Sequence, residues 1–216
     1  LTVDRSTISH NRTSWGWWSA PEGGGILNNG NLTVRRSTIS GNQAGRGSGI
    51  SSRFEGDAVV TIEDSTITNN LDGVNIIANF VTVRNSVLAG GCSIHRTLIS
   101  LGHYLADTGN CRLDQPSDQP DTEPMLGPLQ DNAGPTWTHV PLEGSPLIDR
   151  GWCDPGQDQR GVPRPLDGNA DNVAICDIGA VEYVPDCDEP ERPCDDRFEV
   201  IGPGGEVIVI QNDSDG

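Results

Sequence analysis

The sequence has no lysine among its 216 residues, so all 14 of its basic side chains are arginine. Aromatic residues make up only 5% of the chain, and hydrophobic residues 34%. No apolar run approaches the roughly 20 residues that a membrane-spanning helix requires. No apolar period of three to four residues indicates an amphipathic helix either. These absences exclude a helical bundle and a membrane span, and leave an all-β chain rich in glycine, which numbers 27.

Charge is distributed unevenly along the chain. Residues 1–100 contain 8 arginines and 7 acidic residues, whereas residues 101–216 contain 6 arginines and 24 acidic residues. An acidic second half argues against binding to nucleic acid or to anionic membranes. It is compatible with divalent cations or simply with solubility, and solubility is the simpler explanation.

One eleven-residue phrase occurs four times in the first part of the chain. Its pattern is apolar-x-apolar-x-x-Ser-x-apolar-x-x-Asn, with glycine replacing the final Asn in the last copy, and successive copies start 31, 28 and 21 residues apart. The four copies occupy residues 1–11, 32–42, 60–70 and 81–91. Repeats at such spacings predict a stacked architecture, because a single repeat cannot bury its own apolar side.

Each phrase predicts two short strands separated by a bend. Leu32 and Val34 are two positions apart and share one face of a strand. Ile39 is five positions beyond Val34, so it faces the same interior only if the chain bends near Arg36 and Ser37. The β-branched composition favours strands.

Small polar residues mark the corners of the predicted stack. A serine stands at the bend, and an asparagine that closes three of the copies offers an amide that can bond to its equivalent in the next layer. The serines are Ser6, Ser37, Ser65 and Ser86, and the asparagines are Asn11, Asn42 and Asn70. Glycine-rich segments at 23–28, 47–52 and 71–75 each supply a third short strand. Three strands per layer predict a right-handed parallel β-helix. The alternative is an antiparallel sandwich of unrelated strands.

Four phrases in the second half resemble a known family. They are residues 124–139, Gly-Ser-Pro-Leu-Ile-Asp-Arg-Gly at 144–151, residues 158–165, and Cys-Asp-Ile-Gly-Ala-Val-Glu-Tyr at 176–183. Together with the repeats, they are similar to the choice-of-anchor Q family of bacterial secreted proteins. The resemblance implies a secreted or surface-exposed right-handed β-helix that is often tethered by an interchangeable anchor. It implies no known reaction.

These patterns divide the chain into three parts: β-helix coils at 1–91, a loop-rich cap at 92–185, and an acidic linker with a hairpin at 186–216. A cap would cover the apolar positions that a solenoid exposes. We expect apolar cap residues to pack on the stack and a buried polar clasp to hold them. The apolar residues are Leu126, Leu129, Trp137, Leu147, Ile148 and Ile178, and the clasp residues are Asp149, Arg160 and Asp177. The turn of the hairpin is expected at 202–205.

Six cysteines, spaced unlike a zinc site, predict three disulfides. The expected pairs are Cys92–Cys111, Cys153–Cys176 and Cys187–Cys194. Disulfides indicate an oxidising location, outside the cell or at its surface. Free buried thiols are the alternative.

An Asp-x-Asn-x-Asp segment suggests a calcium site. Asp167, Asn169 and Asp171, with Asp177 beyond them, place oxygen ligands as in the first half of a calcium loop. Ile178 stands where the bidentate glutamate belongs, and Asn172 where the glycine belongs. The alternative is an Asp/Asn turn without metal.

Nothing in the sequence predicts catalysis. The four histidines are isolated, no nucleophile elbow occurs, and no close carboxylate pair recurs where adjacent layers would meet. Trp15, Trp17 and Trp18 form an aromatic cluster that either contacts a glycan or protein partner or covers the first coil.

We therefore expect a non-enzymatic, extracellular structural or adhesive protein. Because the chain starts within a repeat, we expect it to be a processed piece or fragment of a longer protein. Leu1 and Val3 would form an open edge, to which a neighbour's C-terminal strand could add, giving a head-to-tail filament. The residues of that strand are Val207, Ile208, Val209 and Ile210. The alternative is a carbohydrate-binding or polysaccharide-cleaving β-helix.

Overall fold

The structure is a computed structural model that describes residues 1–13, 21–52, 58–108, 110–111, 114–185, 197–201 and 207–211. The chain divides into two compact units, Leu1–Tyr183 and Val184–Gly216. Every regular element in the described ranges is a β-strand, so none of them contains a helix that could cross a membrane. The predicted all-β class is confirmed.

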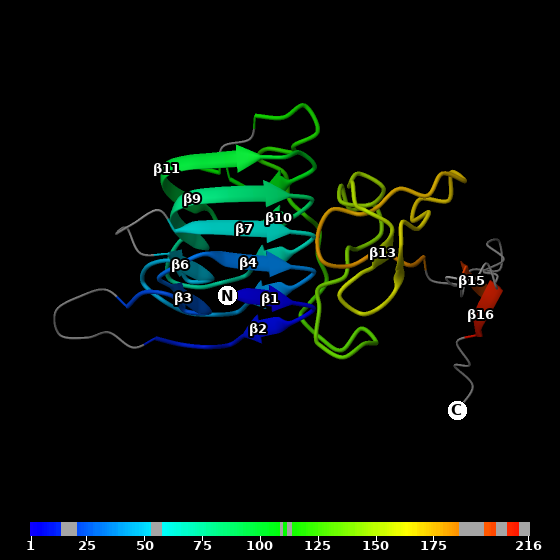
Figure 1. Cartoon of the computed structure of the whole chain (residues 1–216), viewed down its shortest axis with the longest axis horizontal. Helices are drawn as coiled ribbons and strands as arrows, with labels where there is room; N and C mark the ends of the chain where they lie inside the picture. Colours follow the sequence, from blue (N-terminus) through cyan, green and yellow to red (C-terminus); the bar gives the residue numbers. More distant parts are fainter. Residues whose placement is uncertain are drawn as a thin grey trace. The chain divides into compact units, whose positions relative to one another are not determined.

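Most strands of the first unit lie parallel in two sheets (Figure 1). The first sheet has the order β1-β4-β7-β9-β6-β3, and β11 also pairs with β9. Its strands are β1 (Thr2–Asp4), β3 (Ile26–Asn28), β4 (Leu32–Arg35), β6 (Ile50–Ser52), β7 (Val59–Glu63), β9 (Ile76–Arg84) and β11 (Cys92–Ser100). The N-terminal half of β9 pairs with β6 and its C-terminal half with β7, so the sheet curls strongly into a half-barrel.

The second sheet has the order β12-β10-β8-β5-β2 and is also parallel. Its strands are β2 (Thr7–Ser9), β5 (Thr38–Ser40), β8 (Thr66–Thr68), β10 (Val87–Leu88) and β12 (Leu105–Ala106). In both sheets each strand pairs with the strand at the equivalent position of the next repeat, as with Ile8, Ile39 and Ile67. The repeats therefore form successive layers of a stack.

The bend within each repeat is confirmed. Leu32, Val34 and Ile39 are all buried, although parity would place Ile39 on the other face of a straight strand. The chain turns at Arg36, whose φ is 44°, in the left-handed region that is unfavourable for most side chains. The equivalent residues of the other repeats have the same conformation, with φ of 45° at Arg5, Asp64 and Asn85.

The serine after each bend connects adjacent layers. The Ser37 hydroxyl donates a hydrogen bond to the Arg35 carbonyl (2.7 Å) and accepts one from the Ser6 N–H (3.1 Å). Ser65 likewise accepts from the Ser37 N–H, and Ser86 from the Ser65 N–H. We call this chain of bonds the serine ladder. It gives each bend a polar partner in the interior, where an unpaired N–H would be costly.

An asparagine ladder runs beside it. The Asn42 side-chain oxygen accepts hydrogen bonds from the backbone and side-chain N–H groups of Asn11 (3.1 and 2.9 Å). Asn42 donates in the same way to Asn70, at 2.9 Å from both nitrogens. Its side chain also donates to the Ile8 carbonyl (2.9 Å). The predicted amide contact between layers is confirmed.

The stack extends beyond residue 91, where the phrase ends. The C-terminal half of β11 pairs with β9, and β12 pairs with β10, so a further layer follows the last recognisable repeat. This layer could not be predicted from the sequence, because its second strand is only two residues long and its corner lacks the Ser-x-apolar pattern.

The loop-rich segment packs along the side of the stack, against the outer face of the second sheet. Thr38, Ser40 and Thr66 point away from the interior, yet all three are buried. Their hydroxyls bond to the loop segment: Thr38 to the Gln159 side chain (2.7 Å), Ser40 to His139 Nε2 (2.8 Å), and Thr66 to the Ala180 N–H (3.1 Å). The segment is therefore a side cover, which we call the cap.

The expected apolar packing of the cap is confirmed for four of its six residues. Leu147, Ile148 and Ile178 are buried, and Leu126 packs against the same cluster. Leu129 is half-buried. The expectation for Trp137 is wrong, because its side chain is 54% exposed. Only its backbone carbonyl faces the stack, where it accepts a hydrogen bond from Thr7.

Two disulfides and two hairpins complete the described structure. Cys92–Cys111 and Cys153–Cys176 are bonded as predicted, whereas Cys187 and Cys194 lie outside the described residues. β13 (Gly156–Gln157) and β14 (Pro163–Arg164) form an antiparallel pair in the cap. β15 (Arg197–Ile201) and β16 (Val207–Gln211) form the predicted C-terminal hairpin.

The asparagine ladder gives a first prediction. Asn42→Ala removes a buried amide that bridges three layers and leaves its partners unsatisfied, so the free energy of unfolding should fall by about 1–3 kcal/mol. Urea denaturation measures this change. Asn29→Ala, at an exposed position, is the matched control. Equal stability of the two variants would show that the ladder contributes nothing.

Candidate functional site

In the four repeats the last residue of the first strand is charged, and the sign alternates from one repeat to the next. Asp4 pairs in register with Arg35, Arg35 with Glu63, and Glu63 with Arg84. Ion pairs join Arg35 to Asp4 (3.2 Å) and Arg84 to Glu63 (3.5 Å). Opposite charges on neighbouring strands stabilise their pairing, and like charges oppose it. This charge ladder therefore favours the observed register.

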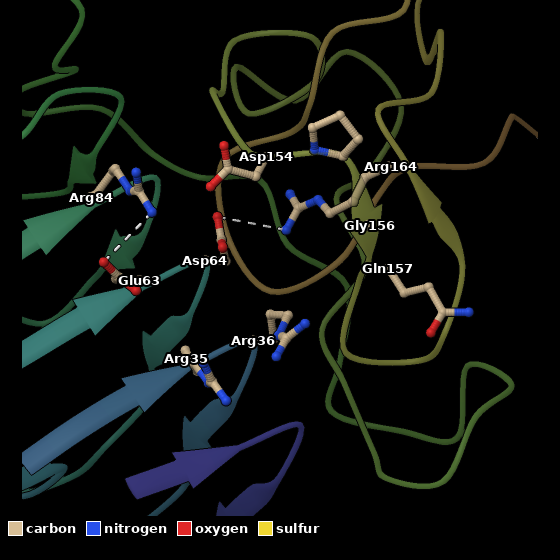
Figure 2. Close-up of a pocket in the computed structure, with 10 residues that line it drawn as sticks. Arg35, Arg36, Glu63, Asp64, Arg84, Asp154, Gly156, Gln157 and Arg164 are labelled. Carbon is tan, nitrogen blue, oxygen red and sulfur yellow. Dashed lines mark ion pairs between the residues drawn. The ribbon is translucent and has the colours of Figure 1, made fainter. Parts of the chain in front are cut away.

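A cleft of about 200 Å³ opens beside the charge ladder (Figure 2). One wall consists of residues at the ends of β4, β7 and β9, and the other of the cap segment 154–157 together with Arg164. The lining residues are Arg35, Arg36, Glu63, Asp64, Arg84, Asp154, Pro155, Gly156, Gln157 and Arg164. Four guanidinium groups and three carboxylates thus meet in one small space.

Two arginines of the stack have N–H groups that make no hydrogen bond to another described residue. Arg36 donates to both oxygens of Asp4 (3.1 and 3.0 Å), which uses two of its five N–H groups. Arg84 pairs with Glu63 and stacks on the Trp152 ring, 4.8 Å from its centroid. The Arg84 Nε is buried and has no hydrogen-bond partner among the described residues.

Arg164 joins the cap to the stack from inside. Its side chain is 2% exposed and pairs with Glu182 at 2.7 Å. It also donates to the Asp177 carbonyl (2.7 Å) and lies 3.8 Å from the Asp64 carboxylate at a layer corner. A buried cation is tolerated only when paired and hydrogen-bonded, so these contacts fix the guanidinium in place.

The predicted polar clasp is buried, but its centre differs from the prediction. Asp149 and Asp177 are buried, and Arg160 pairs with buried Asp158 (3.0 Å). The Asp158 carboxylate accepts further N–H groups, including that of Glu182 (3.1 Å). The central ion pair, Arg164–Glu182, was not predicted. Both partners belong to family-like phrases, but their sequence positions do not reveal which acid meets which arginine.

Burial changes the protonation of the acidic side chains in this clasp. The pKa of Asp177 rises to about 7, first because of burial and second because of the nearby Glu182 carboxylate. Burial also raises the pKa of Glu182, although Arg164 opposes the change. Asp149 has a raised pKa for the same principal reason, burial. At a pH between the unfolded and folded pKa values of these carboxyl groups, the folded state therefore keeps protons that the unfolded chain releases.

The predicted calcium ligands bind backbone groups. The Asp167 carboxylate accepts the N–H groups of Asp171 (3.2 Å) and Asn172 (2.7 Å), and the Asn169 side chain accepts that of Asp171 (2.9 Å). Asp177 accepts the N–H groups of Asp149 and Tyr183 within the clasp. These bonds match the metal-free turn. In the described ranges no group of three or more His, Cys, Asp and Glu side chains could hold a metal ion. Calcium binding remains an untested prediction.

The predicted partner-binding residues belong to three separate segments of the chain. Leu1 is 74% exposed, and Val3 packs partly buried against the core. Residues 207–210 belong to β16 of the second unit. Trp15, Trp17 and Trp18 lie outside the described residues.

The cleft itself was missed at the level of sequence, although one signal was present. Aligning the four repeats shows the fourth position alternating as Asp4, Arg35, Glu63 and Arg84. In a parallel stack these positions must be neighbours. The other wall, with Asp154 and Gln157, depends on where the cap docks, which no local pattern specifies.

The clasp gives a prediction for the pH dependence of stability. Because the pKa of Asp177 is about 7 in the fold and 3.8 for an unperturbed carboxyl group, unfolding releases its proton at pH values between these two. The free energy of unfolding should therefore decrease as pH rises from 5 to 7.5, by at most about 1.4 kcal/mol per pH unit for one proton. Urea denaturation at a series of pH values measures this slope.

Asp177→Asn should flatten that slope, whereas Asp131→Asn, at an exposed position, should not change it. Burial lowers the pKa of His139, so this residue makes the free energy of unfolding rise with pH. Its contribution is the same in the parent chain, Asp177→Asn and Asp131→Asn. An unchanged slope in Asp177→Asn would contradict the assignment.

Comparison of the chain with protein-family models, curated proteins and solved structures gives no match. Its function must therefore be inferred from the stack, the cap and the cleft.

Proposed function

We propose that the chain is a right-handed parallel β-helix from a secreted or cell-surface protein with a structural, adhesive role and no enzymatic activity. The observation that carries this proposal is the in-register pairing of the repeats. Serine, asparagine and charge ladders join successive layers, and the cap covers one side. Such a stack is a stiff rod suited to presenting a surface at a distance.

The β-helix form is supported by three strand positions per layer. Strands β4, β5 and β6 follow one another in the second layer, and each pairs in parallel with its equivalent in the layers around it. Right-handedness follows from the strong general preference of parallel crossover connections.

An extracellular location and the choice-of-anchor Q resemblance support each other. Cys92–Cys111 and Cys153–Cys176 close loops of the last layers and of the cap, and such bonds persist in oxidising surroundings. The four family-like phrases all lie within the cap. In the resembled family, this block accompanies secreted repeat proteins that are held at the cell surface.

A non-enzymatic role is supported by the state of the carboxylates. Asp149, Asp177 and Glu182 are buried and accept backbone N–H groups. Glu63 and Asp64, at the cleft, are paired with arginines. Hydrolysis of a glycosidic bond requires two carboxyl groups that are free to act on the substrate.

Self-association through β16 is the most specific form of this proposal. Among the described residues, β15 and β16 pair with each other and with no further strand, which leaves the outer edge of each open to another strand. Two-stranded hairpins are marginal alone, and extended strands add readily to open sheet edges. We propose that β16 adds to the stacked sheet of a second copy.

Deleting residues 197–216 should abolish concentration-dependent assembly, as followed by sedimentation velocity and negative-stain microscopy. Val209→Pro, which removes a strand N–H, should weaken assembly in the full chain. Asp213→Pro, two positions beyond β16 in the sequence, is the matched control. Assembly that survives both the deletion and Val209→Pro would refute the strand-addition proposal.

A further inference from the structure

We infer that the cleft beside the charge ladder binds an acidic saccharide, with arginines receiving a carboxylate and the cap segment contacting the sugar. This inference deepens the adhesive role, on which it rests, by naming a ligand class. It uses none of the residues proposed for assembly through β16.

The arginines provide the reason to expect an anion. Each guanidinium has five N–H donors, and the hydrogen bonds of Arg35 and Arg36 to Asp4 use one and two of them. The Arg35 side chain is 46% exposed. Within the described part of the chain the buried Nε of Arg84 has no hydrogen-bond partner, and leaving such a donor unsatisfied is costly. The donors available to a ligand at this wall are the remaining N–H groups of Arg35 and Arg36.

The carboxylates of the stack do not cancel this donor surplus. Asp4 is engaged by two arginines, Glu63 by Arg84, and Asp64 by Arg164 and the Asn85 side chain. Carboxylates only accept hydrogen bonds, and each of these three already has a donor group of the protein beside it. The groups left over are guanidinium N–H groups, whose planar fork matches a carboxylate.

The opposite wall offers groups that suit a sugar ring. Asp154 and Gln157 are exposed and could bond to hydroxyl groups. Trp152, two residues before Asp154 in the chain, is 47% exposed, and Arg84 of the cleft lining stacks on its ring. Aromatic faces pack against the apolar face of a sugar while polar groups bind its edges. Figure 2 shows Asp154, Gly156 and Gln157 across the cleft from Arg35 and Arg84.

The two walls are fixed before any ligand arrives. The Trp152 N–H donates to the Asn85 side chain (3.0 Å) at a layer corner, and Cys153 is bonded to Cys176. Arg164 is held by the clasp. A preorganised site loses little conformational freedom on binding. At about 200 Å³ the cleft is smaller than the roughly 300–1,000 Å³ of drug-sized sites, and so suits one sugar unit of a chain.

The test is isothermal titration calorimetry on the full chain with a β-1,4-linked glucuronate trisaccharide. The methyl-esterified trisaccharide and cellotriose are neutral probes, and triglutamate is a peptide carrying the same acidic group. The acidic saccharide should bind, and the neutral sugars should bind at least about tenfold more weakly, since a charged hydrogen bond is lost.

Arg36→Gln and Arg84→Gln should each weaken binding of the acidic trisaccharide by about tenfold or more. The affinity of Arg36→Lys should lie between that of Arg36→Gln and that of the parent chain. Arg46→Gln, at an exposed arginine paired with Glu22 outside the cleft, is the matched control. Circular dichroism melting of every variant verifies the fold. If Arg36→Gln unfolds, Arg35→Gln replaces it, because Asp4 then keeps its bond to Arg36.

Equal binding of the acidic and esterified sugars, or equal loss in Arg46→Gln, would overturn the inference. So would triglutamate binding as tightly as the acidic saccharide, which would assign the cleft to acidic peptides. The assembly assay is interpreted separately. A chain that binds the saccharide but does not assemble would support the cleft site and refute only the proposed filament.

Discussion

The hydrogen bonds between equivalent serine and asparagine residues in successive layers are the interaction on which the rest of the structure depends. Each repeat bends through a left-handed residue, and the serine that follows supplies an acceptor to the layer before it. Asparagine does the same at the next corner. These bonds hold equivalent residues in register, and that register places the fourth residue of every repeat on one line. The charge ladder is a consequence of the stack, and its residues line one wall of the cleft.

The cap is as much a part of the stack as the repeats are. Its polar side chains satisfy the outward-facing hydroxyls of the second sheet, so Thr38 and Ser40 are buried without becoming unsatisfied. The clasp around Arg164 then fixes the cap segment that forms one wall of the cleft. This arrangement places buried acidic groups close together and couples the stability of the cap to pH through Asp177.

The sequence predicted those features that a local pattern can encode. The bend before Ser37, the inward Ile39, the amide contacts of Asn42, two disulfides and the tail hairpin all followed from spacing and residue type. It did not predict the extra layer at β12, whose strand is too short to show a period. Nor did it reveal the Arg164–Glu182 pair or the exposure of Trp137, because both depend on how the cap meets the second sheet.

Residue-resolved amide hydrogen exchange tests the central claim of interlayer ladders most directly. The N–H groups of Ser6, Ser37 and Ser65, each donating to the next serine, should be exchange-protected, with Ser37 and Ser65 approaching the level of global unfolding. The Asn42 N–H should behave like Ser37. Exchange at these positions as fast as at the exposed loop residues Asp131 and Glu143 would contradict the account.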